Sequence, residues 1–499
     1  MIIAPLPLDL LRSHITSLLV PAFSSLSISH DIKERQIRDA LEIIRKPTRC
    51  EVMALPVLRL LPGTKEFGTS VASELAEKIK ASNLIAGVNV EGIFLNFRVH
   101  REEFLKLILQ RIVQDGGNFS SAALPRSEER RKVVVCAMQC NEIGNQIRGK
   151  ILAGFVARIL ELSGCEVHRV KDWRGTEMNK DGEENSVDGK MCSEEHEVLG
   201  FEPTKGHAWG HLASGSNLPD DIETLDLSSL GLGRPKLRVS GEPTELANDV
   251  SFLRHHLQYA SSIYIVAPNR RALHFKQAFH LVNSEQCHHV EYLPLRGIST
   301  SVSEVMARAI DAMDQIMREN EGKLDELVLE LSKEDKIEEV VSRTARGAAK
   351  AAVLTQIEQI RRTREVVFDW DRLMDVRGDS GVYLEYTHAR LCGIERKACV
   401  RLDPNADLSL LHGDEVIVLA SILMRYPNAV LLSHQSMDPQ PLMSILFELA
   451  HALSEAHRVL RVKGRQSAVA DARWLLLWSA RCVLGSGLKL LGVEPLERM

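Results

Sequence analysis

The chain has 499 residues, and 62 Lys and Arg against 67 Asp and Glu give it a formal net charge of −5. At about 150 residues per domain, this length suggests roughly three domains. The 44% hydrophobic and 26% charged content excludes wholesale disorder, and nine scattered cysteines do not make a disulfide framework. No apolar run approaches the ~18 residues that span a bilayer, and the N-terminus lacks a basic signal region, so we expect a soluble cytoplasmic protein. The acidic balance excludes a chain-wide basic coat but leaves room for a local nucleic-acid-binding face.

Residues 1–122 are predicted to form a small α/β domain. Apolar residues at helical spacing over 9–19 predict a helix, and the apolar run 52–61 suits a buried strand. Alternation around Gly92 predicts a hairpin over residues 88–97. A helix over 105–113 completes the domain.

Residues 128–345 have the pattern of a Rossmann-type domain. A β-branched strand is followed by a glycine turn, by a helix over 147–163 that Gly164 ends, and by a second strand, which together make a βαβ unit. The predicted strands of its parallel sheet are 133–135, 165–170, 262–267 and 290–295. Residues 174–200 are acidic and hydrophilic, so we interpret them as a flexible insertion.

Nearly every segment after residue 302 has helical periodicity, and residues 346–499 are predicted to form an all-α domain. Residues 474–491 are strongly apolar on one face. Gly485 and Gly487 within that helix permit close packing against a neighbour.

Two motifs of the Rossmann region allow a functional and a structural interpretation. The turn EIGNQIRGK (142–150) opens a helix after a strand and can hold an anion, an idea that Arg148 and Lys150 favour. It has no G-x-G-x-x-G or Walker pattern, and a single glycine is usually only a turn residue. Cys136 and Cys140 have no second ligand pair at zinc spacing, so we expect buried thiols and no metal.

Two charged clusters also allow both a functional and a structural interpretation. The stretch 343–364 is rich in arginine and lysine, which suits phosphate contact along RNA but also a merely solvated helical face. The acidic cluster 220–223 follows a proline and is most simply a turn. No hydrolase or zinc-protease motif occurs. The residues by themselves therefore predict the architecture and a basic face, but no reaction.

Several blocks in chain order resemble arginyl-tRNA synthetase, especially the cytoplasmic fungal form. They are LDLLRSHI (8–15), MALPVLRL (53–60), GIFLNF (92–97), residues 151–173, 263–279 and 366–391, and GLKLLGVEPLERM (487–499). The block VVFDWDRLMDVRGDSGVYLEYTHARL (366–391) is the most specific. The resemblance implies an α/β Rossmann-type, class I synthetase-like core. It adds a small N-terminal tRNA-binding-like α/β domain and an all-α, anticodon-binding-like (DALR) C-terminal domain.

The chain departs from that family at its ATP signatures. Family members carry an H-x-G-H signature where this chain reads EIGNQIRGK, without histidine. The second signature corresponds to RGISTSVSE (296–304), without its lysine, and residues 239–250 lack the tyrosine of the family's arginine-domain segment. Because these residues serve adenylation, their absence favours resemblance to the fungal arginine-containing cyclodipeptide synthases. Such an enzyme makes cyclo(Arg-Xaa) from arginyl-tRNA and a second aminoacyl-tRNA, with no ATP or other cofactor. The alternatives are an arginine–tRNA ligase with divergent ATP signatures and a non-enzymatic arginine-tRNA-binding adaptor.

The resemblance also suggests roles for individual residues. Acyl transfer needs a general base and donors for an oxyanion; the candidate bases are Asp249 and Glu245, then Asp220, Asp221 and Glu223. The candidates for arginine binding, by their place in the matched blocks, are Asp172, Trp173, His274 and Gln277, although core packing would equally explain the tryptophan. The candidates for tRNA contact are Arg148, Lys150, Arg361, Arg362, Arg364, Tyr383, Tyr386 and Arg390, where the tyrosines would stack on bases or pack between helices.

Overall fold

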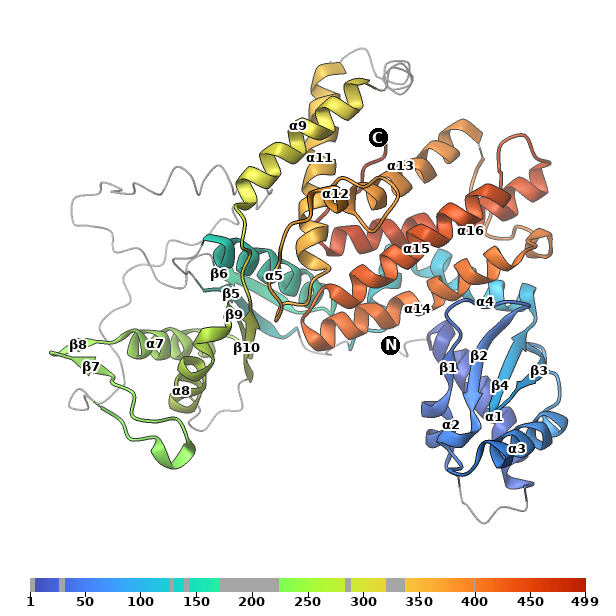
Figure 1. Cartoon of the computed structure of the whole chain (residues 1–499), viewed down its shortest axis with the longest axis horizontal. Coiled ribbons are helices and arrows are strands. Elements are labelled where there is room, and N and C mark those ends of the chain that lie inside the picture. The colour runs from blue at the N-terminus through green and yellow to red at the C-terminus, as the bar shows by residue number, and fades with distance from the viewer. Residues whose placement is uncertain are drawn as a thin grey trace.

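The computed structural model describes residues 5–26, 32–125, 130–138, 143–170, 224–282, 289–319, 337–398 and 400–499. Figure 1 shows the arrangement along the chain: a small N-terminal α/β domain, a central parallel sheet flanked by helices, and a large helical C-terminal part. Short 3₁₀ helices lie at Ser228–Leu230, Asn269–Arg271 and Leu408–Leu410.

The N-terminal domain is a four-stranded antiparallel sheet with helices packed against it. The sheet has the order β1 (Glu42–Ile43), β2 (Glu51–Pro56), β4 (Phe94–Val99), β3 (Ile85–Glu91), and the helices are α1 (Pro7–Ser24), α2 (Glu34–Ala40), α3 (Lys65–Lys78) and α4 (Arg101–Asp115). Gly92 turns the β3–β4 hairpin with φ of +60°, which confirms that prediction. The expected strand 52–61 is shorter, because the chain turns into a 3₁₀ helix at Val57–Arg59.

A short 3₁₀ helix, Gly116–Ser121, joins this domain to the helical part. The ring of Phe119 stacks on Tyr426 with centroids 6.3 Å apart. Ser120 Oγ lies 2.9 Å from the same tyrosine's hydroxyl. The N-terminal domain is therefore packed against the core of the helical domain.

The central sheet is wholly parallel, with strand order β10–β9–β5–β6. Its strands are β5 (Lys132–Ala137), β6 (Glu166–Val170), β9 (Ser262–Pro268) and β10 (His289–Leu295), and its helices are α5 (Ile143–Leu162), α7 (Glu245–Leu257) and α8 (Ala272–Val282). Alternation along β5 builds both faces: Val133 and Val135 join the core with α5, whereas Val134 and Cys136 join the core with α7 and α8. The strand order reverses between β5 and β9, which places the binding crevice of this fold class beyond their carboxyl ends. The hairpin β7 (Arg238–Val239) and β8 (Glu242–Pro243) precedes α7.

The helical domain surrounds a continuous apolar core. Its helices are α9 (Val302–Glu319), α11 (Ile337–Glu358), α12 (Trp370–Leu373), α13 (Gly381–Ala398), α14 (Asp414–Ser436), α15 (Gln440–Val459) and α16 (Ser467–Leu490). The expected boundary between residues 345 and 346 falls inside α11. A Cβ on Gly487 would lie 2.6 Å from Leu446 Cδ2, and one on Gly485 would lie 3.1 Å from His388 Nε2, which confirms the expected close packing.

Helix α14 is long and apolar enough to cross a membrane by length and composition. In the structure, 72% of its most apolar window is buried inside the protein. It is therefore placed as a core helix of the helical domain.

Candidate functional site

Two glycine-bearing segments meet at the carboxyl edge of the parallel sheet. The first turn of α5 follows β5, and the loop 296–299 follows β10. A Cβ on Gly144 would lie 2.3 Å from the carbonyl oxygen of Ile298, and one on Gly297 would lie 2.2 Å from Asn145 Oδ1. This contact is possible only because both positions are glycine.

The two segments, together with Glu365, line a pocket of about 390 Å³. Its lining residues are Asn145, Arg296, Gly297, Ile298 and Glu365. Asn145 lies in the stretch that stands in place of the H-x-G-H signature, and Arg296 begins the segment that corresponds to the second signature. The structure therefore brings together the two stretches that resemble the family's ATP-binding segments. None of these five was among the expected site residues, although their positions after two parallel strands are visible in the sequence.

Arg148, an expected tRNA contact, is completely buried. Its guanidinium donates to the carbonyl oxygens of Arg296, Ile360, Arg361 and Arg364. Burial lowers the pKa of this guanidinium to about 10, against an opposing effect of Asp438, so the side chain stays charged at neutral pH. Arg148 therefore cannot reach tRNA, and that assignment is corrected.

A second polar cluster lies between α7 and α8. His274 Nε2 is 2.7 Å from Asp249 Oδ2, and the two side chains are 16% and 2% exposed. Asp249 also raises the pKa of the Cys136 thiol, second to burial, which places this carboxylate close to the end of β5. Gln277 Nε2 donates to the Leu232 carbonyl at 2.7 Å. Three expected residues, Asp249, His274 and Gln277, thus lie on one side of the sheet.

Glu245, an expected general base, is instead paired with Arg271 at 2.5 Å, with both side chains about one-third exposed. This carboxylate is therefore engaged by a cation of the protein itself. Asp172, Trp173, Asp220, Asp221, Glu223 and Cys140 lie outside the described residues.

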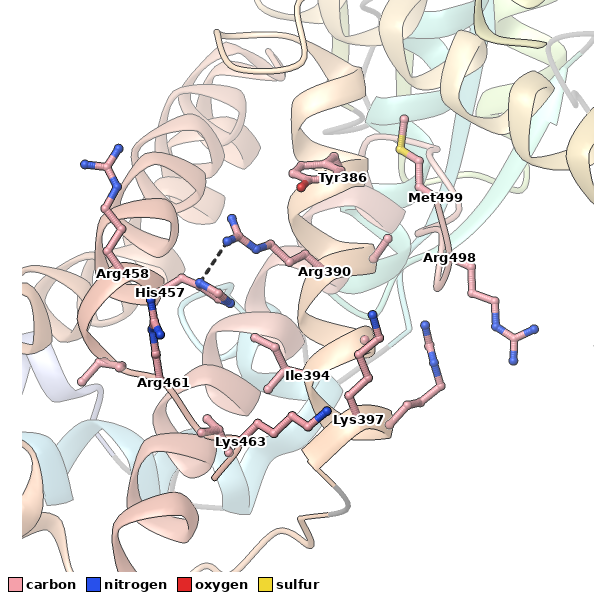
Figure 2. Close-up of a pocket in the computed structure, with 15 residues that line it drawn as sticks. Tyr386, Arg390, Ile394, Lys397, His457, Arg458, Arg461, Lys463, Arg498 and Met499 are labelled. Atoms are coloured by element: carbon pink, nitrogen blue, oxygen red, sulfur yellow. Dashed lines mark hydrogen bonds between the residues drawn. The ribbon is translucent and has the colours of Figure 1, made fainter. Parts of the chain in front are cut away.

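The helical domain carries a larger and strongly basic pocket, of about 720 Å³ (Figure 2). The cations that line it are Arg390, Arg396, Lys397, Arg458, Arg461, Lys463 and Arg498, and no Asp or Glu occurs among its described lining residues. In Figure 2, Lys463 extends across the pocket toward Lys397, whereas Arg458 and Arg498 point outward. We define this set as the basic pocket. It is suited to a polyanion.

Tyr386 and Arg390, both expected tRNA contacts, lie in the basic pocket. Arg390 Nη2 donates to His457 Nδ1 at 2.9 Å. Burial, then Arg390 and Arg461, lowers the pKa of His457, which favours the neutral ring that can accept this bond. The other pocket residues were not predicted, although the basic run HRVLRVKGR (457–465) was a usable signal.

The remaining expected tRNA contacts are dispersed. Tyr383 is 5% exposed, and its hydroxyl donates to Ala450 O at 3.0 Å, so it packs between helices rather than stacking on bases. Arg362 donates to Pro294 O at 3.1 Å and is partly buried. Arg361 and Arg364 are exposed, and Lys150 is partly exposed on α5.

Comparisons with known proteins identify a domain family for the C-terminal part and relatives for much of the chain. Residues 384–499 match the DALR anticodon binding domain. A probable cytoplasmic arginine–tRNA ligase of Dictyostelium discoideum is 37% identical over 249 residues, which is 48% of this chain and 40% of that protein. A probable mitochondrial arginine–tRNA ligase of Mus musculus is 24% identical over 86% of this chain and 89% of that protein.

Solved structures agree at the level of the fold. The arginyl-tRNA synthetase of Thermus thermophilus superposes with a TM-score of 0.62 at 17% identity, covering 98% of this chain and 100% of that chain. The Plasmodium falciparum enzyme gives 0.67 at 13% identity, covering 98% and 99%. The expected fold class, a synthetase-like Rossmann core with a helical anticodon-binding-like domain, is confirmed.

The same comparisons contradict the predicted reaction. Both relatives described above bear the name arginine–tRNA ligase, and nothing in them supports cyclodipeptide synthesis, a diketopiperazine product or a second aminoacyl-tRNA. Nor do they support the inference that ATP chemistry has been lost. The synthase prediction is therefore wrong, and its alternative is better supported. The chain is arginyl-tRNA synthetase-like, with an anticodon-binding-type helical domain.

Proposed function

We propose that the protein is an arginine–tRNA ligase with divergent ATP-binding segments. The observation that carries the proposal is the alignment with a named arginine–tRNA ligase over 86% of this chain. The pocket at the sheet edge supports it, because Asn145 and Arg296 lie there together on the two segments that stand in place of the ATP signatures.

The reaction has two steps, an adenylyl transfer and then an acyl transfer. The carboxylate of arginine attacks the α-phosphorus of ATP and pyrophosphate leaves; a ribose hydroxyl of tRNA then attacks the adenylate carbonyl and AMP leaves. Arg296 supplies a cation for the leaving pyrophosphate in place of the missing lysine, and Asn145 supplies an amide donor in the stretch that lacks the signature histidines. The start of α5 adds main-chain N–H groups that favour an anion.

Asp249 is better suited to substrate binding than to general-base catalysis. A carboxylate that is 2% exposed and close to the end of β5 can pair with the guanidinium of arginine through two parallel hydrogen bonds. The contact from His274 holds that carboxylate in place. We therefore reassign Asp249 from the base to the arginine subsite, with His274 as its positioning residue.

The basic pocket is the proposed tRNA contact of the helical domain. Its cations neutralise phosphates, and Tyr386 presents a ring on which an unpaired base can stack. The DALR match over residues 384–499 covers this pocket.

The test is ATP–pyrophosphate exchange and aminoacylation by the purified chain, with arginine, lysine and citrulline compared, in the presence and absence of arginine tRNA. Of the three amino acids, we expect only arginine to support pyrophosphate exchange and to become esterified to tRNA. Binding of tRNA without exchange or ester formation would overturn the ligase proposal and favour the non-enzymatic adaptor.

A further inference from the structure

Arg148 lies where three segments of the chain meet. It belongs to α5, and its Nη1 donates to Arg296 O, in the loop after β10, at 2.5 Å and also to Arg364 O. Its Nη2 donates to Ile360 O and Arg361 O, both at 3.0 Å, just beyond the end of α11. One side chain therefore joins the Rossmann helix, the pocket loop and the helical domain.

The chemistry of these contacts depends on arginine. A buried, charged guanidinium makes charge-assisted bonds to four main-chain carbonyls, and a planar fork can serve two pairs of acceptors at once. Ile360 and Arg361 follow a helix end, where carbonyls lack partners within the helix and the helix dipole is negative. Lysine keeps the charge but lacks this fork.

The pocket loop is also attached to the helical domain through its main chain. Arg296 N–H donates to Arg362 O at 2.9 Å, and Val366 N–H donates to Gly297 O at 3.1 Å. Ile298 and Val366 form a parallel bridge. The loop thus pairs with residues 362–366 as with a short strand.

Residues 362–366 are in turn attached to the turn between α14 and α15. The N–H of Arg362 donates to Asp438 Oδ2 at 3.1 Å, and Arg362 Nη1 donates to Pro294 O at the end of β10. The position of the pocket loop is therefore determined by the helical domain as well as by the sheet.

We propose that Arg148 is a positioning residue: it holds loop 296–299 against the helical domain and so sets the shape of the pocket lined by Asn145 and Arg296. The structural part of this proposal is independent of the reaction. Its consequence for ATP affinity rests on the proposed ligase function.

Arg158 provides a matched control on the same helix. It also joins α5 to the helical domain, because its Nε donates to Leu490 O at 2.8 Å, but this acceptor belongs to the end of α16 and not to loop 296–299 or residues 360–364. Arg158→Met therefore removes an arginine between the two domains without changing the bonds from Arg148 to that loop.

The experiment compares Arg148→Met, Arg148→Lys and Arg158→Met in the full chain. Amide hydrogen exchange is followed in peptides covering 294–301 and 360–367, beside KM for ATP and kcat in pyrophosphate exchange. We expect Arg148→Met to accelerate exchange in both peptides and to raise KM for ATP about tenfold or more, with a smaller change in kcat. Arg148→Lys should be intermediate, and Arg158→Met should lower thermal stability without either effect.

Equal exchange in Arg148→Met and Arg158→Met, or unchanged protection in both peptides, would overturn the positioning role. If Arg148→Met does not fold, Arg148→Lys is the deciding variant. It keeps the charge but lacks the guanidinium fork, so it must then accelerate amide exchange in the same two peptides. A wild-type chain that shows no pyrophosphate exchange would defeat the ligase proposal, while the amide-exchange comparison would still judge Arg148.

Discussion

The buried carboxylate of Glu385, on α13, accepts a hydrogen bond from the N–H of Leu496 at 2.7 Å, although 111 positions separate them. His388, one turn later, donates from Nδ1 to the carbonyl of the same leucine at 2.9 Å. Both side chains therefore hold residue 496 beside Arg498 and Met499, which line the basic pocket. This attachment, together with the bond from Arg396 Nη1 to Glu497 O at 3.2 Å, holds the last residues of the chain as a wall of that pocket.

Glu385→Leu should release this segment and weaken tRNA binding, because it removes the acceptor for Leu496 N–H. Glu385→Gln is the matched control, since its amide oxygen preserves the acceptor at the same volume. We expect a several-fold loss of tRNA affinity and faster proteolysis near residue 496 for the leucine variant alone. Equal affinity of the two variants would show that the pocket wall is held by other contacts.

The basic pocket should account for most of the salt-dependent tRNA binding of the helical domain. Arg461→Ala combined with Lys463→Ala should reduce the slope of log affinity against log salt by roughly 0.7 for each phosphate that the pocket no longer neutralises. Arg343→Ala with Arg346→Ala, at exposed positions of α11, removes the same charge from outside the pocket. An identical reduction of the slope in both pairs would mean that net charge, rather than the pocket, governs binding.

Asp249→Asn should raise KM for arginine by about 10- to 100-fold, the value of one to two charge-assisted hydrogen bonds, and leave tRNA affinity unchanged. The measurement is pyrophosphate exchange against arginine concentration. Glu245→Gln is the comparison, because that carboxylate is partly exposed and already paired with Arg271. If Asp249→Asn lowered kcat at constant KM, the general-base role would be restored.

Gly144→Ala should disturb the pocket at the sheet edge, because its Cβ would lie 2.3 Å from the Ile298 carbonyl. The loop must then move, and KM for ATP should rise. Gly149→Ala, further along α5, would place its Cβ at an ordinary 3.6 Å from Leu295 Cδ2 and should be neutral or slightly stabilising. The kinetic constants and melting temperatures of the two variants separate pocket damage from loss of fold.

Glu358 should make stability depend on pH. It is completely buried, neither carboxylate oxygen has a hydrogen-bond partner within the described part of the chain, and burial raises its pKa from 4.5 to about 8. The folded protein thus binds this proton more tightly than the unfolded chain does. The stabilisation is complete below about pH 4.5 and is lost as the pH rises through about 8.

Glu358→Gln removes that titration while keeping the shape of the side chain. The difference in melting temperature between variant and wild type should therefore grow in favour of the variant from about pH 6 to about pH 8.5. A constant difference across this range would show that Glu358 does not titrate there.

Local patterns in the sequence were sufficient for the main elements. Strand β5 follows from its run of β-branched residues, the end of α5 from Gly164, and the β3–β4 hairpin from Gly92, because each depends on backbone preferences of neighbouring residues. The reaction did not follow in this way. The missing histidines and lysine of the ATP signatures predicted a cyclodipeptide synthase. That prediction was wrong, because the relatives that align along the chain are named arginine–tRNA ligases.

The functional surface was decided by tertiary structure. Tyr383 and Tyr386 are three positions apart on one helix, yet Tyr383 is packed inside and Tyr386 lines the basic pocket, because neighbouring helices bury most of α13 and leave Tyr386 and Arg390 uncovered. Arg148 has the same charge as any surface arginine, but its carbonyl partners lie 148 to 216 positions away. The sequence by itself determined where strands and helices begin, since those signals are local. Only long-range packing decided which charges were buried to hold the fold and which stayed at the surface to meet a ligand.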